Sequence, residues 1–485
     1  MKLKELLRGL DIRELCADGE MEITALCCDS RKASAGSLFV AIRGFTSDGH
    51  RFLPAVAAQG ASCCVCEEAP TAALPYVLVP DSRRALAQLS KNYYGDPAGA
   101  MTMIAFTGTN GKTSSTMLLK RVLERAGGGM AGLTGTNQNM IGPEVIPTER
   151  TTPESIELQA LFADMRDAGC RYVVMEVSSH SLVLQRVAGI RFAVSVFTNL
   201  SQDHLDFHGT MEEYARAKSL LFSSQSEKAV INLDDDWSDY MLSRCACPAL
   251  TYSTKNPAAD LFAKDIVLGP TGVDYTLCWQ GRALAIHLGT PGLFSVYNSL
   301  GVIGAALALG LAPEAVAAAL ADAPGVTGRM EVVPTDGDYS ILIDYSHTPD
   351  ALENALRAAR GFCPGRLVVL FGCGGDRDRG KRPLMGAAAA RLADLVIVTS
   401  DNPRSEAPEA IIADILPGLA GFSTPYTVIP ERPAAIEWAI EQHQPGDVIL
   451  LAGKGHELYQ EIGGQKLPMD ERKIVADCLA WRRAR

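Results

Sequence analysis

The most informative segment of this chain is Met101-Thr102-Met103-Ile104-Ala105-Phe106-Thr107-Gly108-Thr109-Asn110-Gly111-Lys112-Thr113. Its apolar first half predicts a buried strand, and the apolar residues of Ser114 to Arg125 recur at helical spacing. A strand, a glycine turn and a helix that begins with Lys-Thr form a phosphate cradle, because backbone N–H groups and the positive helix end face the anion. The lysine can reach the outer phosphates, and the threonine hydroxyl can bind Mg²⁺.

This loop departs from the common phosphate-loop pattern. The common pattern spaces its two glycines more widely, and Phe106 stands where its first glycine would be. The loop is therefore shorter than the standard one or differently shaped, and a chance Gly-Lys-Thr in a surface turn is the alternative. The segment indicates a nucleotide but not how the nucleotide is used.

Composition narrows the class of protein. At 485 residues, with 47% hydrophobic and 21% charged residues, the chain fits a globular protein of two to four domains. A net charge of −11 argues against a nucleic-acid binder. Charges interrupt every apolar pair near Met1, which argues against a signal peptide, and thirteen cysteines then suggest reduced thiols in a cytosol. The alanine-rich stretch 302–320 predicts two short helices, so we expect a cytoplasmic protein without membrane insertion.

Three regions can be separated, and together they predict an α/β fold. We expect a smaller α/β domain over residues 1–98, a central domain with a mainly parallel sheet over 99–325, and a Rossmann-like α/β domain over 326–485. Buried apolar runs alternate with helical patterns in the last two regions, which is typical of parallel sheets. Cys63-Cys64-Val65-Cys66 lacks a partner cluster at zinc spacing, so a buried strand is the preferred interpretation.

Three polar loops follow strands of the third region. They are Gly372 to Arg377, Asp401 to Arg404, and Gly453 to Glu457. Open α/β sheets bind ligands at the carboxyl ends of their strands. We therefore expect these loops to share one pocket.

Two central loops carry residues suited to a metal. Glu176 ends one strand, and His204 follows the next. Hard oxygen ligands suit Mg²⁺, which makes Glu176 a candidate, whereas His204 is as well explained as a structural residue. On the residues alone we expect Lys218 on an exposed helix face, and Arg329 and Asp344 in solvated or capping positions.

Five motifs together resemble the Mur ligases of bacterial cell-wall synthesis. They are Gly108-Thr109-Asn110-Gly111-Lys112-Thr113, Glu176-Val177-Ser178-Ser179-His180, Asn199-Leu200-Ser201-Gln202-Asp203-His204-Leu205-Asp206, Gly328-Arg329-Met330-Glu331 and Asp344-Tyr345-Ser346-His347-Thr348-Pro349. The likeness extends over all three regions in the family's order. It implies a domain for a UDP-sugar, a central P-loop ATPase and a domain for an incoming amino acid.

The resemblance also implies site residues. For ATP it implies Gly108, Thr109, Asn110, Gly111, Lys112, Thr113, Ser114, Asn298, Arg329 and Asp344. For Mg²⁺ it implies Thr113, Glu176, His204 and Lys218, the last as a carbamylated lysine; Lys112, Lys218, Glu176 and His204 are the implied catalytic set. For the UDP-N-acetylmuramoyl dipeptide it implies Ser30, Thr151, Thr152, Ser178 and Arg186, and for the amino acid Arg377, Asp401, Asn402, Pro403, Arg404, Gly453 and Glu457.

The segment Asp401-Asn402-Pro403-Arg404 resembles the family's signature for meso-diaminopimelate. An arginine fork can grip the second carboxylate of this amino acid with two charge-assisted hydrogen bonds, whereas it would repel the second ammonium group of L-lysine. The implied activity is ATP-dependent amide formation through an acyl phosphate, by a monomer. The same ligase with L-lysine, a P-loop small-molecule kinase, a folate polyglutamating ligase and a non-catalytic nucleotide-dependent scaffold are the alternatives.

Overall fold

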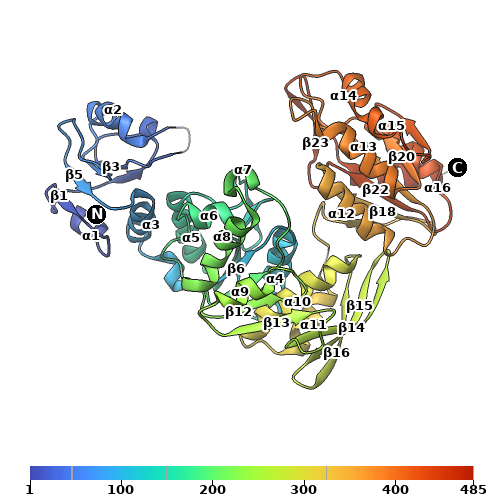
Figure 1. The fold of residues 1–485 in the computed structure, drawn as a ribbon, viewed down its shortest axis with the longest axis horizontal. Helices are drawn as coiled ribbons and strands as arrows, with labels where there is room; N and C mark the ends of the chain where they lie inside the picture. Colours follow the sequence, from blue (N-terminus) through green and yellow to red (C-terminus); the bar gives the residue numbers. More distant parts are fainter. Residues whose placement is uncertain (45–46, 149, 324, 484–485) are drawn as a thin grey trace. The chain divides into compact units, whose positions relative to one another are not determined.

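The computed structural model describes residues 1–44, 47–148, 150–323 and 325–483 (Figure 1). The chain divides into two compact units. Unit 1 holds Met1–Leu261 and Gly301–Pro313, and unit 2 holds Phe262–Leu300 and Glu314–Arg485. Pro324, beside the expected boundary between the second and third regions, lies outside the described residues.

A small sheet forms the N-terminal part of unit 1, as predicted. Its strand order is β1-β5-β4-β3-β2, and its strands are parallel except for β1, which runs antiparallel to β5. Strand β4 is buried along its whole length, which confirms the interpretation of its three cysteines as strand residues. The elements are α1 (Leu3–Leu6), β1 (Glu14–Cys16), β2 (Ala25–Cys27), β3 (Ser37–Val40), α2 (Leu53–Ala58), β4 (Cys63–Cys66), β5 (Tyr76–Leu78) and α3 (Ser82–Tyr93).

Within unit 1 the strands of the larger sheet follow the order β13-β12-β11-β6-β10-β7-β8-β9. The strands from β13 to β7 are parallel, and β8 and β9 are antiparallel additions. This confirms the mainly parallel central sheet. The elements are β6 (Thr102–Thr107), α4 (Lys112–Ala126), β7 (Ala131–Thr134), β8 (Asn139–Ile141), β9 (Glu144–Ile146), α5 (Ser155–Asp167), β10 (Tyr172–Glu176), α6 (Ser179–Val183), β11 (Val194–Phe197), α7 (Leu205–His208), α8 (Met211–Ser224), β12 (Ala229–Asn232), α9 (Ser238–Ser243) and β13 (Ala249–Ser253).

The register of this sheet brings three strand ends together. Strand β6 lies between β10 and β11, with Glu176 opposite Phe106 and Phe197 opposite Thr107. Apolar side chains of α5, α6, α8 and α9 pack with those of the strands in one buried cluster. Residues that follow β6, β10 and β11 therefore meet at one edge of the sheet.

Unit 2 begins with an antiparallel hairpin and helices. The stretch 302–320 forms parts of two helices, as predicted, although the first begins earlier than expected. No helix in the described part of the chain is both long and apolar enough to cross a membrane. The elements are β14 (Leu261–Gly269), β15 (Gly272–Trp279), β16 (Arg282–Leu288), α10 (Leu293–Ala308) and α11 (Pro313–Ala321), of which β14, α10 and α11 each have residues in unit 1.

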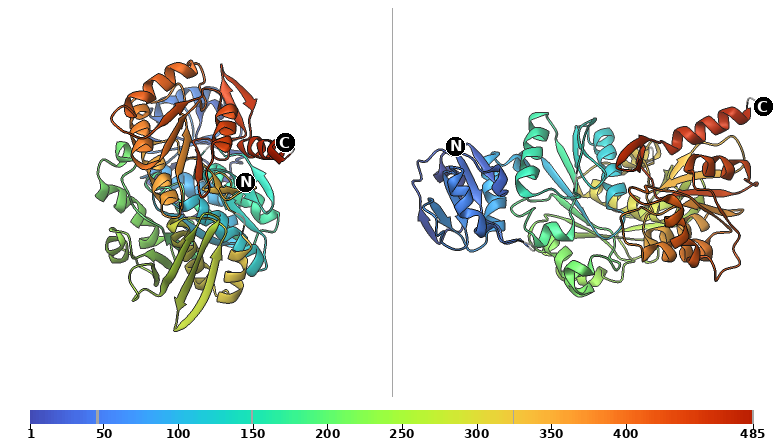
Figure 2. Two further views of the ribbon diagram at one scale, coloured as in Figure 1. Left: turned by 90° about the vertical axis from the view of Figure 1, so that its right-hand side faces the viewer. Right: turned by 90° about the horizontal axis from the view of Figure 1, so that it is seen from above.

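The main sheet of unit 2 has the order β17-β18-β22-β19-β20-β21 and is parallel except for β17. One face packs against α12, α13 and α14 and the other against α15 and α16, so the sheet is doubly wound (Figures 1 and 2). A two-stranded hairpin, β23-β24, lies outside it. The elements are β17 (Glu331–Val333), β18 (Ser340–Asp344), α12 (Pro349–Arg360), β19 (Leu367–Phe371), α13 (Lys381–Leu392), β20 (Leu395–Val398), α14 (Pro408–Ile415), β21 (Tyr426–Val428), α15 (Arg432–Glu441), β22 (Val448–Ala452), β23 (Tyr459–Ile462), β24 (Gln465–Pro468) and α16 (Glu471–Arg483).

Candidate active site

The phosphate loop runs from the end of β6 to the start of α4. Gly108 has φ +152°, and a Cβ at this position would overlap the hydroxyl of Thr198. Only glycine lets the loop pass so close to its neighbour. Lys112 Nζ donates to the carbonyl oxygens of Gly108 (2.8 Å) and Thr109 (2.9 Å), so the lysine folds back over the loop.

The segment that follows β11 holds this loop in place. Asn110 N donates to Asn199 Oδ1 (2.9 Å), Thr109 N donates to Asn199 O (2.9 Å), and Thr198 Oγ1 donates to Asn110 O (2.7 Å). Thr198 and Asn199 were not among the predicted site residues. Their place directly after a strand that neighbours β6 is the signal that could have found them.

Lys218 on α8 contradicts the expectation of an exposed lysine. It is fully buried, and its Nζ donates to Gly108 O (2.9 Å) and lies 4.6 Å from the ring centroid of Tyr214. Burial, together with the positive charge of Lys112, lowers the pKa of Lys218 well below its usual value. Helical spacing is the signal that could have found this, because Tyr214, Leu221 and Phe222 lie four residues before and three and four residues after Lys218 and are buried on the same face of α8.

Glu176 and the residues expected at the muramoyl dipeptide form one network. Thr136, which the sequence analysis missed, donates to Glu176 Oε1 through its N–H and to Oε2 through its hydroxyl, both at 2.9 Å. The Thr136 hydroxyl also lies 3.0 Å from that of Thr151. Thr152 Oγ1 donates to Glu176 O (2.8 Å) and accepts from Ser178 N (3.2 Å). The buried carboxylate of Glu176 therefore lies among hydroxyl groups.

Arg186 extends this network. Its Nη1 donates to Thr152 O (3.1 Å), and its Nη2 lies 2.6 Å from Glu154 Oε1. Thr151, Thr152, Ser178 and Arg186 thus come together, as their implied common role requires.

His204 precedes α7 in a left-handed conformation, with φ +53°. Its half-exposed ring packs edge-on against that of His180, with centroids 4.9 Å apart. Among the described residues, no group of three or more His, Cys, Asp or Glu side chains could hold a metal ion. A metal at this edge would therefore depend on other donors as well.

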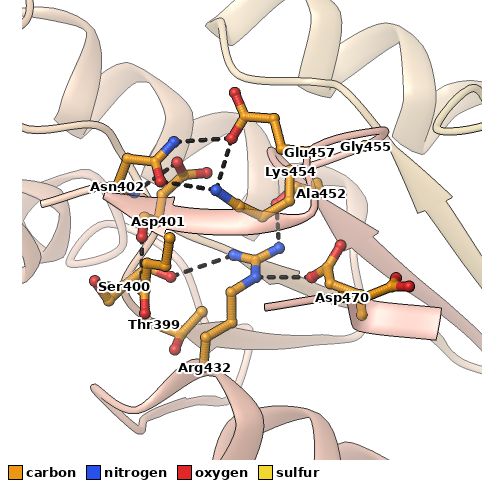
Figure 3. A network of polar contacts seen from close by, with 12 residues as sticks. Thr399, Ser400, Asp401, Asn402, Arg432, Ala452, Lys454, Gly455, Glu457 and Asp470 are labelled. Atoms are coloured by element: carbon orange, nitrogen blue, oxygen red, sulfur yellow. Dashed lines mark hydrogen bonds and ion pairs between the residues drawn. The ribbon is translucent and has the colours of Figure 1, made fainter. Parts of the chain in front are cut away.

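In unit 2 the loops after parallel strands meet, as expected for one pocket (Figure 3). Asn402, after β20, donates through Nδ2 to Glu457 Oε2 (2.9 Å), which belongs to the loop after β22. Lys454 Nζ donates to Asn402 Oδ1 (2.7 Å) and to Glu457 Oε2 (2.6 Å). Lys454 lies inside one of the predicted loops but was not predicted as a site residue.

Arg404 links the loop after β20 to the loop after β19. It has φ +52°, its Nε donates to Glu461 Oε2 (3.0 Å) and its Nη1 to Gly375 O (2.8 Å). A Cβ on Gly374 would lie 2.9 Å from Arg404 Nη1 and 3.7 Å from Cγ of Arg377, so both arginines border this glycine. Arg377 itself is exposed.

Glycines permit the close approach of these loops. A Cβ on Gly375 would overlap the carbonyl oxygen of the buried Pro403. Gly453 has φ +114°, and its Cβ would lie 2.5 Å from Asp401 Oδ2. Asp401 is buried; its Oδ1 accepts from Asn402 N (2.6 Å), and its Oδ2 has no hydrogen-bond partner in the described part of the chain.

The residues implied as nucleotide contacts in unit 2 lie near Tyr345. The Arg329 guanidinium is 5.4 Å from the ring centroid of Tyr345. Asp344 is buried, contrary to the expectation of a solvated residue, and accepts from Met330 N (2.8 Å) and from the hydroxyl of Ser346. Burial raises the pKa of Asp344.

Ser30 and Asn298 take part in none of the contacts described above. Ser30 begins a short 3-10 helix in the N-terminal sheet region and is half-buried. Asn298 is buried within α10.

Comparisons with known proteins match three family models in succession along the chain. The model of the Mur ligase family, catalytic domain, matches residues 22–94, that of the Mur ligase middle domain 106–306, and that of the Mur ligase, glutamate ligase domain, 328–455. The chain is 47% identical over 482 residues to the UDP-N-acetylmuramoyl-L-alanyl-D-glutamate--2,6-diaminopimelate ligase of Caldanaerobacter subterraneus subsp. tengcongensis, which covers 99% of both chains. It is 44% identical over 491 residues to the ligase of that name from Geobacillus thermodenitrificans, which covers 100% of both.

A solved structure gives the same result. A UDP-N-acetylmuramoyl-L-alanyl-D-glutamate--2,6-diaminopimelate ligase matches with a TM-score of 0.77 and 34% identity, over 100% of this chain and 99% of that chain. The family models, the relatives and this fold agree along the whole length. The chain belongs to the Mur ligase family.

Proposed function

We propose that this chain is an ATP-dependent amide ligase of peptidoglycan precursor synthesis. It joins meso-diaminopimelate to the D-glutamyl γ-carboxylate of UDP-N-acetylmuramoyl-L-alanyl-D-glutamate. Full-length relatives that carry the name of this ligase support the proposal. The observation that carries it is the pocket of unit 2, where Asn402 and Glu457 are hydrogen-bonded and Arg404 adds a cation.

Each proposed domain has its own ligand. Residues 1–98 bind the UDP-sugar end, with Ser30 as a contact, residues 99–325 bind ATP, and residues 326–485 bind the amino acid. We propose further that the protein is a cytoplasmic monomer, which light scattering of the purified protein would test.

In the proposed ATP site, the backbone of Gly108 to Ser114 and the start of α4 hold the phosphates. The helix end supplies N–H groups and a partial positive charge to an anion. Lys112, already folded over this loop, neutralises charge on the transferred phosphoryl group. Asn298, Arg329 and Asp344 complete the nucleotide contacts.

The residues around Glu176 fit a magnesium ion as oxygen donors. The buried Glu176 carboxylate accepts hydrogen bonds only from the neutral groups of Thr136 among its described contacts, so its negative charge suits a cation. Thr113, Glu176 and His204 would hold Mg²⁺, and phosphates supply the remaining ligands. When bound, the ion adds positive charge at the phosphoryl group.

Lys218 fits carbamylation. Its lowered pKa favours the neutral amine, whose nitrogen can form a bond to CO₂ and release one proton. The resulting carbamate is an oxygen donor where the unmodified chain has an amine.

The acceptor dipeptide is proposed to bind beside Glu176, at Thr151, Thr152, Ser178 and Arg186. A γ-carboxylate oxygen then attacks the γ-phosphorus of ATP and ADP leaves, which gives an acyl phosphate. Because two anions approach each other, catalysis is mainly positioning and charge neutralisation. The amine of diaminopimelate attacks the acyl carbon, phosphate leaves, and the nitrogen loses a proton as the amide forms. Since different parts of the chain hold ATP and the amino acid, we propose that a closing motion precedes chemistry.

A phosphate-release assay with a panel of amino acids tests this function. We expect ADP and phosphate only when both the muramoyl dipeptide and meso-diaminopimelate are present. Arg404→Ala is expected to raise the KM for diaminopimelate about 100-fold, because a charge-assisted contact is lost, and to leave the KM for ATP unchanged. Arg391→Ala, at an exposed arginine of α13, is the matched control.

Three outcomes would contradict the proposal. Equal phosphate release without an amino acid would exclude the ligase reaction. A stable phosphorylated product without an amide would indicate a kinase. Strong incorporation of L-lysine by the unmodified protein would overturn the choice of amino acid.

A further inference from the structure

Lys454 is a buried lysine just beyond the end of β22, and the reaction outlined above gives it no role (Figure 3). Its side chain is 0% exposed. Nζ lies 2.7 Å from Asn402 Oδ1, 2.6 Å from Glu457 Oε2 and 5.2 Å from the ring centroid of Tyr459. An ammonium group carries three hydrogens and accepts none, so both hydrogen bonds are donations by the lysine.

These donations determine which way the Asn402 amide faces. Asn402 Oδ1 accepts from Lys454 Nζ and from the backbone N–H of Glu461 (2.9 Å). Neither partner can accept a hydrogen bond, so the amide oxygen must point toward them and the NH₂ group must point away. One Nδ2 hydrogen reaches Glu457 Oε2 (2.9 Å), which leaves the other for a ligand.

The same lysine makes the two oxygens of the Glu457 carboxylate differ. Oε2 accepts from both Lys454 and Asn402, whereas Oε1 accepts no hydrogen bond in the described part of the chain. The Glu457 side chain is 15% exposed, so it borders the pocket rather than lying wholly inside the fold. Oε1 is therefore the atom available to a ligand.

From this geometry we infer that Lys454 is a positioning residue of the amino-acid site. It makes the pocket present one amide donor to a carboxylate and one carboxylate oxygen to an ammonium group. These are the two groups at one end of an amino acid. The inference rests on the proposed function, because diaminopimelate is the ligand that offers this pair of groups at its second end.

A second buried ion pair of unit 2 shows what a purely structural pair looks like. Arg432 and Glu471 lie 2.8 Å apart with side chains at most 1% exposed. Arg432 donates to the carbonyl oxygens of Ala452 (2.9 Å) and Ser400 (3.4 Å), so it joins the ends of two strands. Lys454 instead donates to two side chains, and one of these is partly exposed.

The test is Lys454→Met, which keeps the length of the side chain and removes its charge and donors. We expect the KM for meso-diaminopimelate to rise at least tenfold, while the KM values for ATP and the muramoyl dipeptide change less than twofold. The matched control is Lys466→Met, because Lys466 is exposed and lies 4.3 Å from the ring centroid of the same Tyr459. The control should leave all three KM values unchanged.

A double-mutant cycle separates positioning from general support of the fold. If Lys454 acts through the Asn402 amide, Lys454→Met should raise the KM for diaminopimelate much less in an Asn402→Ala background than in the unmodified protein. If Lys454→Met does not fold, Lys454→Gln replaces it in the cycle, since glutamine removes the charge but can donate one hydrogen bond. The same selective rise is expected.

The inference is overturned if a folded Lys454 variant keeps its KM for diaminopimelate within twofold, or if all three KM values rise together. It is also overturned if the effects of the Lys454 and Asn402 substitutions on the KM for diaminopimelate are additive in free energy. Failure of the proposed function would appear elsewhere, as unmodified protein that releases no phosphate with diaminopimelate. In that case both proposals fall.

Discussion

The phosphate loop and the amino-acid pocket are built from partners at different distances along the chain. Lys112 donates to the carbonyls of Gly108 and Thr109, three and four residues before it. Asn402 and Glu457, which face each other in the pocket, are 55 residues apart. The first site combines this local backbone shape with supporting contacts from Asn199 and Lys218, which lie 89 and 110 residues from their partners in the loop. In the second site the contact between the two side chains is itself long-range, so a sheet must bring its loops together.

The buried lysines of the two sites also have different partners. Lys218 donates to a neutral carbonyl, and its charge is disfavoured by burial and by Lys112. Lys454 is equally buried but is paired with the carboxylate of Glu457. The two buried lysines therefore differ in their partners: Lys218 donates to a backbone carbonyl, and Lys454 donates to a carboxylate and an amide oxygen.

The largest expected effect is at the phosphate loop. Lys112→Met should lower kcat/KM for ATP-dependent phosphate release by about 1,000-fold, because a preorganised charge at the phosphoryl group is lost. The thermal unfolding midpoint should change far less than the rate, since Lys112 is only partly buried and donates to carbonyls of its own loop. Lys473→Met, at an exposed lysine of α16, is the control. A variant at position 112 with a tenth of the normal rate would refute the role of this lysine.

Lys218→Met should separate activity from stability. We expect kcat to fall about 100-fold, as for loss of a metal-linked or electrostatic group, while the unfolding midpoint stays the same or rises. Replacing a buried group that is costly to charge with an apolar side chain of similar length stabilises the folded protein.

Lys120→Met is the matched control for Lys218→Met. Lys120 is also buried but pairs with Glu124 at 2.6 Å, so its loss leaves a carboxylate without that partner. The control should lower the unfolding midpoint and keep kcat. Thermal melts and steady-state rates of both variants check this, and a stabilising role for Lys218 would show as a lower midpoint.

The smallest expected effect is at the pocket. Gly453→Ala places a Cβ 2.5 Å from Asp401 Oδ2 at φ +114°, so the free energy of unfolding should fall by about 1–3 kcal/mol. The KM for diaminopimelate should rise about tenfold as Asp401 and its neighbour Asn402 shift, because a small misplacement of positioning groups costs binding and rate. Gly421→Ala meets nothing within 4 Å and should leave both quantities unchanged. Denaturant unfolding and KM measurements on Gly453→Ala and Gly421→Ala test this prediction. A rise in the KM for ATP would contradict an effect limited to the amino-acid site.

Much of this arrangement could be predicted from the sequence. The strand before Gly108, the helix from Lys112 and the buried strand at Cys63–Cys66 follow from apolar patterns and glycine placement. The meeting of the loops after β20 and β22 followed from a rule about parallel sheets. The Thr136 contact to Glu176 obeys the same rule, because Thr136 follows β7 and Glu176 ends its parallel neighbour β10, but the sequence alone did not show that these two strands are adjacent.

The sequence alone specifies elements and short loops, because hydrophobic period and glycine conformation act over a few residues. It therefore specified an α/β chain with a phosphate loop, and its motifs specified the family. Packing specified the rest: that Lys218 is buried against Gly108, that Asp344 is not solvated, and that Lys454 orients Asn402 and Glu457. Burial and partner identity depend on elements far apart in the chain, and they determine charge state and hydrogen-bond direction in a site.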